Sequence, residues 1–277
     1  MSYLKLKISY QKEKMKNSDR NSPLGAGGMK AMIFSAGLGT RFKPWTDSHP
    51  KALAVVNGKS LLQRNIEYLQ QYGITDIVVN VHHFADQLIE TIIKSKGWGS
   101  KITITDERDE LLETGGGLLK AKEFFTPGEK FITCNADILT DLDINKLISF
   151  HTEKKALITF GVTQRKTSRY LLFDESDRLC GWRNATTGED KGPILTFLEG
   201  QGIKNTVVEK AYSCVAVFEY DVFRLMEEKG FLGKFSLIDV YLALAMEHLI
   251  LGFDHTGDRF VDVGKPGSIV IAESVFP

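Results

Sequence analysis

Apolar and polar positions follow two periods along the chain, and together they predict a sheet covered by helices. Runs typical of buried strands occur at 31–34, 77–81, 101–105 and 130–134. Between them, residues 61–72 and 85–95 carry apolar side chains at helical spacing, and Gly73 ends the first of these helices. Strands alternating with helices in this order indicate an α/β fold: a doubly wound, mostly parallel sheet with helices on both faces.

The first 28 residues differ from the rest of the chain. They contain six Lys or Arg residues against one Glu and one Asp, and they end in a stretch rich in Gly, Ser and Pro at 21–28. Such a composition is typical of linkers. We therefore expect an N-terminal extension over 1–28, disordered rather than a short edge strand, followed by one folded domain over 29–277.

Composition then excludes several classes of protein. The chain has 277 residues, of which 43% are apolar and 25% charged, so it can bury a large core. Its formal net charge is zero, so it is not drawn as a whole to nucleic acid or to an acidic membrane. The three cysteines are odd in number and widely spaced, which suits a reducing cytoplasm better than a disulfide framework or a zinc site. The sequence offers neither an apolar stretch long enough for a membrane helix nor a signal-peptide core.

The segment after the first strand, residues 37–51, has the features of a phosphate-binding loop. It contains two glycines, Arg41, two prolines and a closing Lys51. The glycines allow backbone N–H groups to approach phosphate oxygens, and the two cations supply charge from both ends. A dinucleotide-binding fingerprint would need a third glycine where Phe42 stands, and the Walker pattern G-x-x-x-x-G-K-[ST] does not occur. The joint spacing therefore favours a nucleotide loop of another kind.

This loop resembles the G-x-G-T-R-x-x-P-x-T-x-x-x-P-K signature of the sugar-1-phosphate nucleotidylyltransferases. Residues 135–141 resemble the family's N-G-D-x-x-x-D, with alanine for glycine, and 259–266 resemble its W-x-D-V-G-T, with phenylalanine for tryptophan and lysine for threonine. The resemblance covers 29–277 and implies a Rossmann-like nucleotide-diphospho-sugar transferase domain. It implies nucleotide binding by Ala36, Gly37, Gly39, Thr40, Arg41, Lys51, Glu113, Gly115, Gly116 and Asn135, with Arg41 and Lys51 catalytic.

A magnesium site is expected at Asp137, which comes just past a strand end, where α/β sheets bind ligands. A helix N-cap is the structural alternative, and it would serve equally well for Asp141 or Asp143 ahead of Ile144. The resemblance to N-G-D-x-x-x-D is what assigns the metal to Asp137. The resemblance implies that Asp262 is the second ligand. Mg²⁺ takes one or two protein carboxylates and completes its shell with water and phosphates, so two aspartates suffice.

Three successive glycines, residues 115–117, stand at the start of a predicted helix. Glycine there is costly in backbone entropy, so something flat or close must lie against it, and a nucleobase would fit. The string Leu112-Glu113-Thr114-Gly115-Gly116-Gly117 resembles the L-E-T-G-G-G of N-acetylmuramate 1-phosphate uridylyltransferases, in which this loop contacts the base. Uridine is therefore the first choice of base, and guanosine the alternative.

The acceptor side of the site is expected near the middle of the chain. Many relatives carry a Glu-Lys-Pro whose lysine holds the sugar phosphate, and the corresponding stretch here contains Trp182 and Arg183. We expect Arg183 to bind the sugar phosphate and Trp182 to stack on the sugar. Cys214 replaces a glycine of the family. The charged stretch 106–110 is interpreted as a solvated loop, and the sequence shows no conspicuous Ser-His or Cys-His constellation.

Together these features predict an enzyme that condenses a sugar 1-phosphate with a nucleoside triphosphate and releases pyrophosphate. The expected pair is UTP with N-acetylmuramate 1-phosphate, Mg²⁺ is the expected cofactor, and the protein is expected to be a cytoplasmic monomer or homodimer that binds neither nucleic acid nor membrane. A mannose-1-phosphate guanylyltransferase and a non-catalytic nucleotide-sensing module remain as alternatives. A dinucleotide oxidoreductase would need a third glycine and an acidic residue about 20 positions on, and this sequence has neither at those places.

Overall fold

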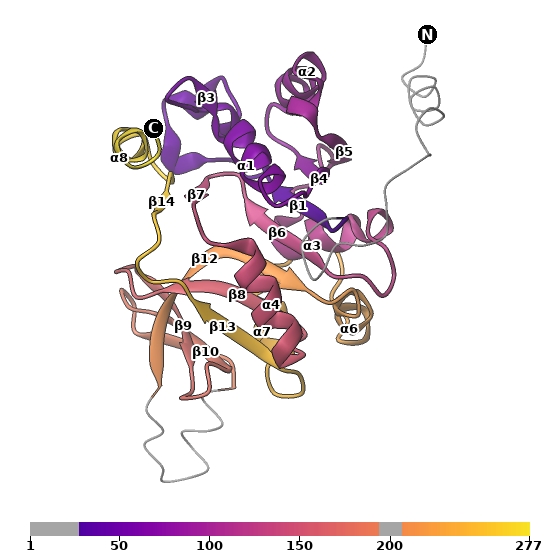
Figure 1. Cartoon of the computed structure of the whole chain (residues 1–277), viewed down its shortest axis with the longest axis vertical. Coiled ribbons are helices and arrows are strands. Elements are labelled where there is room, and N and C mark those ends of the chain that lie inside the picture. Colours follow the sequence, from indigo (N-terminus) through magenta and orange to yellow (C-terminus); the bar gives the residue numbers. More distant parts are fainter. Residues whose placement is uncertain (1–27, 194–206) are drawn as a thin grey trace.

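The computed structural model describes residues 28–193 and 207–277, which form one large sheet with helices packed on two faces (Figure 1). The expected N-terminal extension lies outside the described residues, apart from Gly28. The expectation of an α/β fold with helices on both faces and a mostly parallel central sheet is confirmed.

Four parallel strands form the half of the sheet that carries the predicted site. Their order across the sheet is β5, β4, β1, β6, and each agrees with its predicted range to within one residue at either end. The prediction succeeds because these strands are buried on both faces and therefore read as short apolar runs. Their bounds are β1 Lys30–Phe34, β4 Asp76–Val81, β5 Lys101–Asp106 and β6 Phe131–Asn135.

The other half of the sheet is largely antiparallel, which the apolar pattern did not predict. A long strand, β12, pairs antiparallel with β6 on one side and with β8 and β9 on the other, and β10 and β11 continue from β9. Among the described strands of this half, only β13 runs parallel to its neighbour, β8. The bounds are β8 Ile158–Thr163, β9 Arg169–Phe173, β10 Leu179–Asn184, β11 Glu189–Lys191, β12 Val208–Phe218 and β13 Ile250–Asp254.

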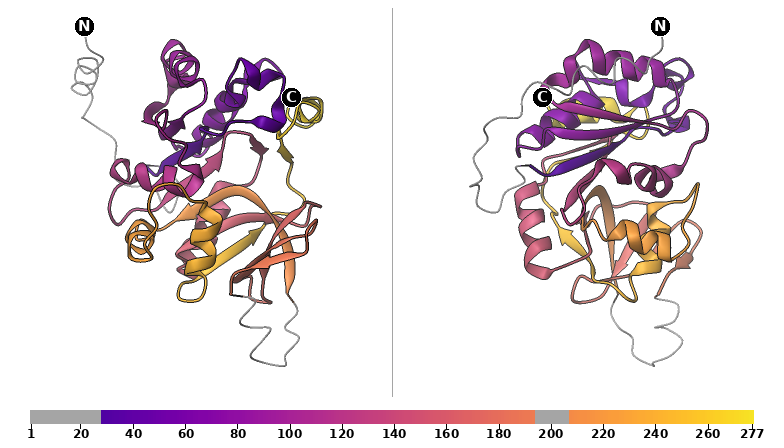
Figure 2. Two further views of the ribbon diagram at one scale, coloured as in Figure 1. Left: turned by 180° about the vertical axis from the view of Figure 1, so that it is seen from behind. Right: turned by 90° about the vertical axis from the view of Figure 1, so that its right-hand side faces the viewer.

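Each face of the sheet buries its own apolar cluster. On β1, Ile33 points to one cluster and Met32 to the other, as strand alternation requires. Helices α1, α2 and α4 cover the first face, with α4 in front in Figure 1; α3, α6 and α7 cover the second, with α6 and α7 in front in the rear view of Figure 2. The helices are α1 Leu61–Gln70, α2 Ala85–Lys94, α3 Glu113–Lys120, α4 Ile144–Lys154, α6 Val222–Glu228 and α7 Leu237–Leu244.

A third, smaller cluster joins the two ends of the described chain. The ring of Phe42, from the loop after β1, is buried against Leu139 of β7 and Val261 of β14, and the C-terminal helix α8 closes the cluster. The loop with the predicted phosphate ligands is thereby fixed to the strand that carries Asp262. The remaining elements are β2 Val55–Val56, β3 Lys59–Ser60, β7 Ile138–Thr140, β14 Phe260–Asp262 and α8 Ser268–Val275.

Side-chain caps set the starts of several helices. Asp143, rather than Asp141, caps α4 by accepting the N–H of Lys146 at 3.2 Å, which leaves Asp137 free of that role. Ser236 caps α7 by accepting the N–H of Ile238 at 3.2 Å, as predicted. Helix α7 ends at Leu244, four residues before the predicted end.

The three glycines of α3 are explained by packing against protein rather than against a ligand. The N–H of Gly115 donates to the carbonyl of Phe235 at 2.9 Å, and a Cβ on Gly116 would stand 2.1 Å from the carbonyl oxygen of Gly233. Both glycines are buried inside the helix. The close neighbour expected from the sequence exists in the 233–235 backbone, so packing alone accounts for these glycines, and their contact with a nucleobase stays a prediction.

Adding a methyl group at this contact should therefore destabilise the protein. Gly116→Ala is expected to lower the free energy of unfolding by about 1–3 kcal/mol, the usual cost of overpacking, because backbone rather than a flexible side chain must move. Gly267→Ala is the matched control, since its Cβ would have nothing within 4 Å. Urea unfolding of both variants measures the difference. Equal stabilities would contradict this explanation of the glycines.

Candidate active site

A cavity of about 380 Å³ opens at the carboxyl ends of β1, β4 and β6. Ligands of open α/β sheets bind at this edge, and the volume suits a small-molecule site. Most of the residues predicted to bind nucleotide line it, together with one predicted metal ligand: Ala36, Gly37, Gly39, Thr40, Arg41, Lys51, Glu113, Asn135 and Asp137.

The loop after β1 is shaped by Gly39. Its φ of 60° lies in the left-handed region, and a Cβ there would stand 2.9 Å from the methyl carbon of Thr46 and 3.2 Å from the Cβ of Lys51. The hydroxyl of Thr46 donates to the carbonyl of Gly39 at 2.9 Å and closes the loop on itself. Glycine at this position therefore allows the loop to fold back until its lysine lies against its glycine end.

Lys51 faces Asp137 across the cavity. Its Nζ lies 2.5 Å from Oδ2 of Asp137, and the two side chains are 12% and 27% exposed. The contact joins the end of the phosphate loop to the loop after β6. Partial burial strengthens such a pair beyond the small contribution of an exposed one.

Arg41 and Asp262 meet at Gly264. A Cβ on Gly264 would stand 2.8 Å from Oδ1 of Asp262 and 3.3 Å from Nη2 of Arg41, so both side chains reach this glycine. Gly264 itself lines the cavity. The structure thus brings Asp262 to the cavity, although its distance from Asp137 along the chain gave no indication of this.

Backbone contacts hold the two aspartates side by side. Strands β7 and β14 pair with Ile138 opposite Asp262, and the N–H of Val263 donates to the carbonyl of Asp137 at 2.9 Å. The buried amide of Asn65, on α1, donates to the carbonyls of Ala136 and Ile138 at 3.0 and 3.1 Å. The turn that carries Asp137 is therefore fixed from both sides.

The donor set fits a magnesium ion better than a zinc ion. Within residues 28–193 and 207–277, no three His, Cys, Asp or Glu side chains come together in a way that would hold a metal. Two carboxylates beside a cavity of nucleotide size are nevertheless what Mg²⁺ needs when a triphosphate supplies further oxygens. Asp137 and Asp262 are the residues that would hold it.

A buried polar chain supports the floor of the cavity, and sequence reasoning missed it. Oδ1 of Asn80 accepts the N–H of Ser35 at 2.7 Å, and Nδ2 of Asn80 donates to Oε1 of Glu107 at 2.8 Å. Oε2 of Glu107 accepts the N–H of Leu112 at 3.2 Å. Glu107 is fully buried, so the interpretation of 106–110 as a solvated loop is wrong for this residue, whereas 108–110 are exposed as expected. Burial raises the pKa of the Glu107 carboxyl, and the two hydrogen bonds oppose that shift.

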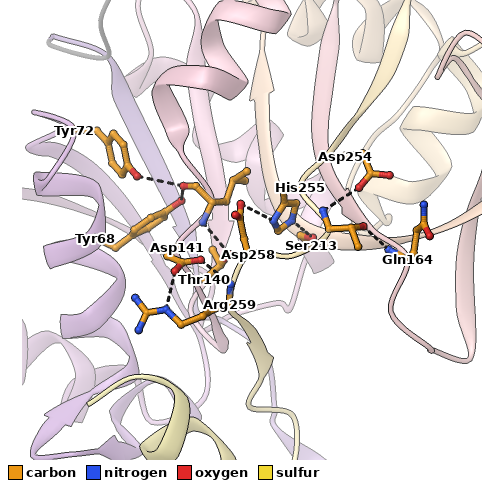
Figure 3. Close-up of polar contacts among 12 residues, drawn as sticks. Tyr68, Tyr72, Thr140, Asp141, Gln164, Ser213, Asp254, His255, Asp258 and Arg259 are labelled. Carbon is orange, nitrogen blue, oxygen red and sulfur yellow. Dashed lines mark hydrogen bonds and ion pairs between the residues drawn. The ribbon is translucent and has the colours of Figure 1, made fainter.

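A Ser-His-Asp arrangement that the sequence did not reveal is formed by Ser213 of β12 and two residues between β13 and β14. Ser213 Oγ lies 2.7 Å from Nε2 of His255, and Nδ1 of His255 lies 3.4 Å from Asp258 (Figure 3). Ser213 is fully buried and burial lowers the pKa of His255, so the group lacks the access that a nucleophile needs. Beside it, Asp141 binds Arg259 at 2.7 Å. These contacts fix the entry to β14 and hence the position of Asp262.

Cys214 occupies a strained position close to both aspartates. It lies at a register shift in β12, and its φ of 55° would suit the glycine that the family usually has. Burial raises the pKa of its thiol, the negative charges of Asp137 and Asp262 raise it further, and the positive charge of Arg165 acts in the opposite direction. The thiol is therefore a neutral neighbour of the site, not a nucleophile.

The predicted acceptor residues have protein partners in this structure. The guanidinium of Arg183 binds both oxygens of Asp190 at 2.7 Å and Glu209 at 2.7 Å, and these bonds raise its pKa. Trp182 packs against the core, and Lys191 lies over its ring at 5.3 Å. Neither residue lines the cavity, because β10 is separated from β6 by β9 and β12. Arg183 serves to join β10, β11 and β12 rather than to bind a phosphate.

Comparison with known proteins places these features in a family. Residues 30–171 match the family model described as Nucleotidyl transferase. A UTP–glucose-1-phosphate uridylyltransferase of Synechocystis sp. is 30% identical over 207 residues, 70% of this chain and 50% of that protein. An N-acetylmuramate alpha-1-phosphate uridylyltransferase of Caulobacter vibrioides is 43% identical over 105 residues, 37% of this chain and 43% of that protein.

A mannose-1-phosphate guanylyltransferase catalytic subunit beta of Dictyostelium discoideum is 30% identical over 174 residues, 62% of this chain and 45% of that protein. The chain thus spans about half the length of these curated relatives. Among solved structures, HddC from Yersinia pseudotuberculosis superposes with a TM-score of 0.70 at 23% identity, over 90% of this chain and 100% of that one, which establishes the shared fold. None of the helices within 28–193 and 207–277 is long and apolar enough to cross a bilayer.

The buried chain through Asn80 yields a prediction with a defined pH dependence. Asn80→Asp places a second carboxylate beside Glu107 and should lower the free energy of unfolding by about 2–3 kcal/mol near pH 7.5. A proton shared by the two carboxylates raises their folded-state pKa above the unfolded value, so the loss relative to wild type should shrink as the pH falls to about 5.5. Urea unfolding at both pH values measures it. A deficit independent of pH would refute the carboxylate contact.

Proposed function

Because the chain belongs to the nucleotidyl transferase family, we propose that it condenses a sugar 1-phosphate with a nucleoside triphosphate and releases pyrophosphate. The observation that carries this proposal is the cavity at the strand ends, which Arg41, Lys51 and Asp137 line and which Asp262 adjoins at Gly264. Two cations beside two carboxylates suit a polyphosphate with its metal ion. A fully buried core beneath the cavity keeps these groups in place.

The reaction needs positioning and charge neutralisation more than proton transfer. An oxygen of the sugar phosphate attacks the α-phosphorus, the bond between that phosphorus and the bridging oxygen of the β-phosphate breaks, and pyrophosphate leaves with the electron pair. The attacking oxygen is already anionic near neutral pH, so no general base is required. Arg41 and the N–H groups of the 37–40 loop would hold the triphosphate in line.

Lys51 would interact in turn with a metal ligand and with the nucleotide. In the structure it neutralises Asp137, and on binding of a nucleotide its Nζ can turn to a phosphate oxygen. Magnesium held by Asp137 and Asp262 would neutralise charge on the α-phosphate and on the leaving pyrophosphate. The gain in charge stabilisation is largest where the partly buried site excludes water.

UTP and N-acetylmuramate 1-phosphate are the proposed substrates. The support is the 43% identity to the Caulobacter vibrioides protein and the shared L-E-T-G-G-G string at 112–117. Leu111, Glu113 and Thr114 line the cavity ahead of the buried glycines, so these residues, rather than Gly115 and Gly116, are placed to meet a base. With this acceptor, the product would be a precursor of the cell wall.

The second candidate reaction is transfer of the guanylyl group of GTP to mannose 1-phosphate. Its support is the similarity to the Dictyostelium discoideum protein. A pyrophosphate-release assay crossing UTP, GTP, dTTP, CTP and ATP with a panel of sugar 1-phosphates decides between them. We expect UTP to exceed GTP by at least about tenfold in kcat/KM. A reversed preference supports the guanylyltransferase. Tight nucleotide binding without turnover of any pair would instead indicate a nucleotide-sensing module.

The metal ligands provide a separate prediction. Asp137→Asn and Asp262→Asn should each lower kcat by at least about a hundredfold and raise the Mg²⁺ concentration that gives half-maximal rate, because an amide binds the cation less strongly than a carboxylate. Asp109→Asn, at an exposed position, is the matched control. Steady-state rates against Mg²⁺ concentration are the measurement. Wild-type Mg²⁺ dependence in both variants would remove these residues from the metal site.

A further inference from the structure

Arg165 stands just after β8 and reaches over β14. Its Nη2 donates to the carbonyl of Tyr212 at 2.9 Å, and its guanidinium carbon lies 4.5 Å from the centre of the Phe260 ring. Its Nε is buried without a hydrogen-bond partner. In the part of the chain that the structure describes, no carboxylate lies within salt-bridge distance of this side chain. A fixed, half-buried cation with unused donors is costly unless it meets an anion.

The position of Arg165 relates it to the metal ligands. Phe260 and Asp262 are two residues apart on β14, so their side chains lie on the same face of that strand. The charge of Arg165 also acts on the thiol of Cys214, as do the charges of Asp137 and Asp262. The guanidinium therefore packs on the face of β14 that Asp262 shares, and Arg165 is outside the set of residues that line the nucleotide cavity.

The charge balance of the site leaves one anion without a protein cation. A nucleoside triphosphate would occupy Arg41 and Lys51, at the ends of the phosphate loop. The phosphate of the second substrate needs its own positive group on the opposite side of the α-phosphate, because attack is in line with the leaving pyrophosphate. Arg183, the cation expected from the sequence, forms ion pairs with Asp190 and Glu209.

We propose that Arg165, stacked on Phe260 and held by the carbonyl of Tyr212, binds the phosphate of the sugar 1-phosphate acceptor. This inference rests on the proposed nucleotidyl transfer and identifies the acceptor side of the same site. The planar guanidinium suits the role, since it presents several N–H donors in a fixed fork and loses little freedom on binding when it is already stacked. Phe260 is a positioning residue for Arg165, because it contacts the guanidinium and not the substrate.

The test is a kinetic comparison of Arg165→Gln with wild type in the full-length protein. The KM for the sugar 1-phosphate should rise at least about tenfold, while the KM for the nucleoside triphosphate stays within about twofold, because only one substrate loses a charged partner. Arg165→Lys keeps the positive charge but loses the planar guanidinium that stacks on Phe260. Its KM for the sugar 1-phosphate should therefore lie between those of wild type and Arg165→Gln. Arg169→Gln, at an exposed arginine four residues along, is the matched control and should behave as wild type.

An unchanged acceptor KM in Arg165→Gln, or an equal rise in both KM values, would overturn the assignment. If Arg165→Gln does not fold, the same comparison of KM values is made with Arg165→Lys. If wild type releases no pyrophosphate with any substrate pair, the proposed reaction fails, and the anion site is tested alone by titrating wild type and Arg165→Gln with inorganic phosphate. Loss of phosphate binding in the variant supports the site, and equal binding refutes it.

Discussion

The ion pair between Lys51 and Asp137 is the contact on which the rest of the site depends. It joins residues 86 positions apart, one closing the loop after β1 and the other starting the turn after β6. Because β1 and β6 are parallel neighbours, their carboxyl ends emerge at the same edge, and the two loops must meet there. The pair also keeps the carboxylate neutralised when no cation is bound. Release of Lys51 to a phosphate would free Asp137 at the moment that a metal-bound nucleotide arrives.

Hydrogen-bonded side chains below the cavity hold these two loops in place. Asn65 holds the turn around Asp137 from the helix side, and the chain from Ser35 through Asn80 to Glu107 links the ends of three neighbouring strands. Asn65, Asn80 and Glu107 are buried and hydrogen-bonded, and removing one partner would leave another unsatisfied. A buried polar group without a hydrogen-bond partner costs free energy, so other positions of these loops are disfavoured.

The two sides of the site are built differently. The nucleotide side rests on parallel strands and a glycine-containing loop, whereas the acceptor side is bounded by antiparallel strands and by β14. On that side Arg183 is part of an ion-pair network at the far end of the sheet, and Cys214 stands in a backbone conformation that suits glycine. Both positions differ from what the family resemblance implies, and the proposed acceptor cation is therefore Arg165 rather than Arg183.

The sequence by itself determined the parallel strands, the helices of the first half and the nucleotide loop, because buried strands read as apolar runs and the spacing of glycines and cations is a local property. It also pointed to Asp137. Tertiary structure alone decided what lies against the glycines 115–117, which neighbours occupy Arg183 and where Arg165 and Glu107 stand. These depend on contacts between segments roughly 20 to 120 residues apart, and no local period records which side chains such contacts bring together. The pairing of Asp262 with Asp137 was available to the sequence only through family resemblance, since the β7–β14 ladder that places them side by side exists only in the folded chain.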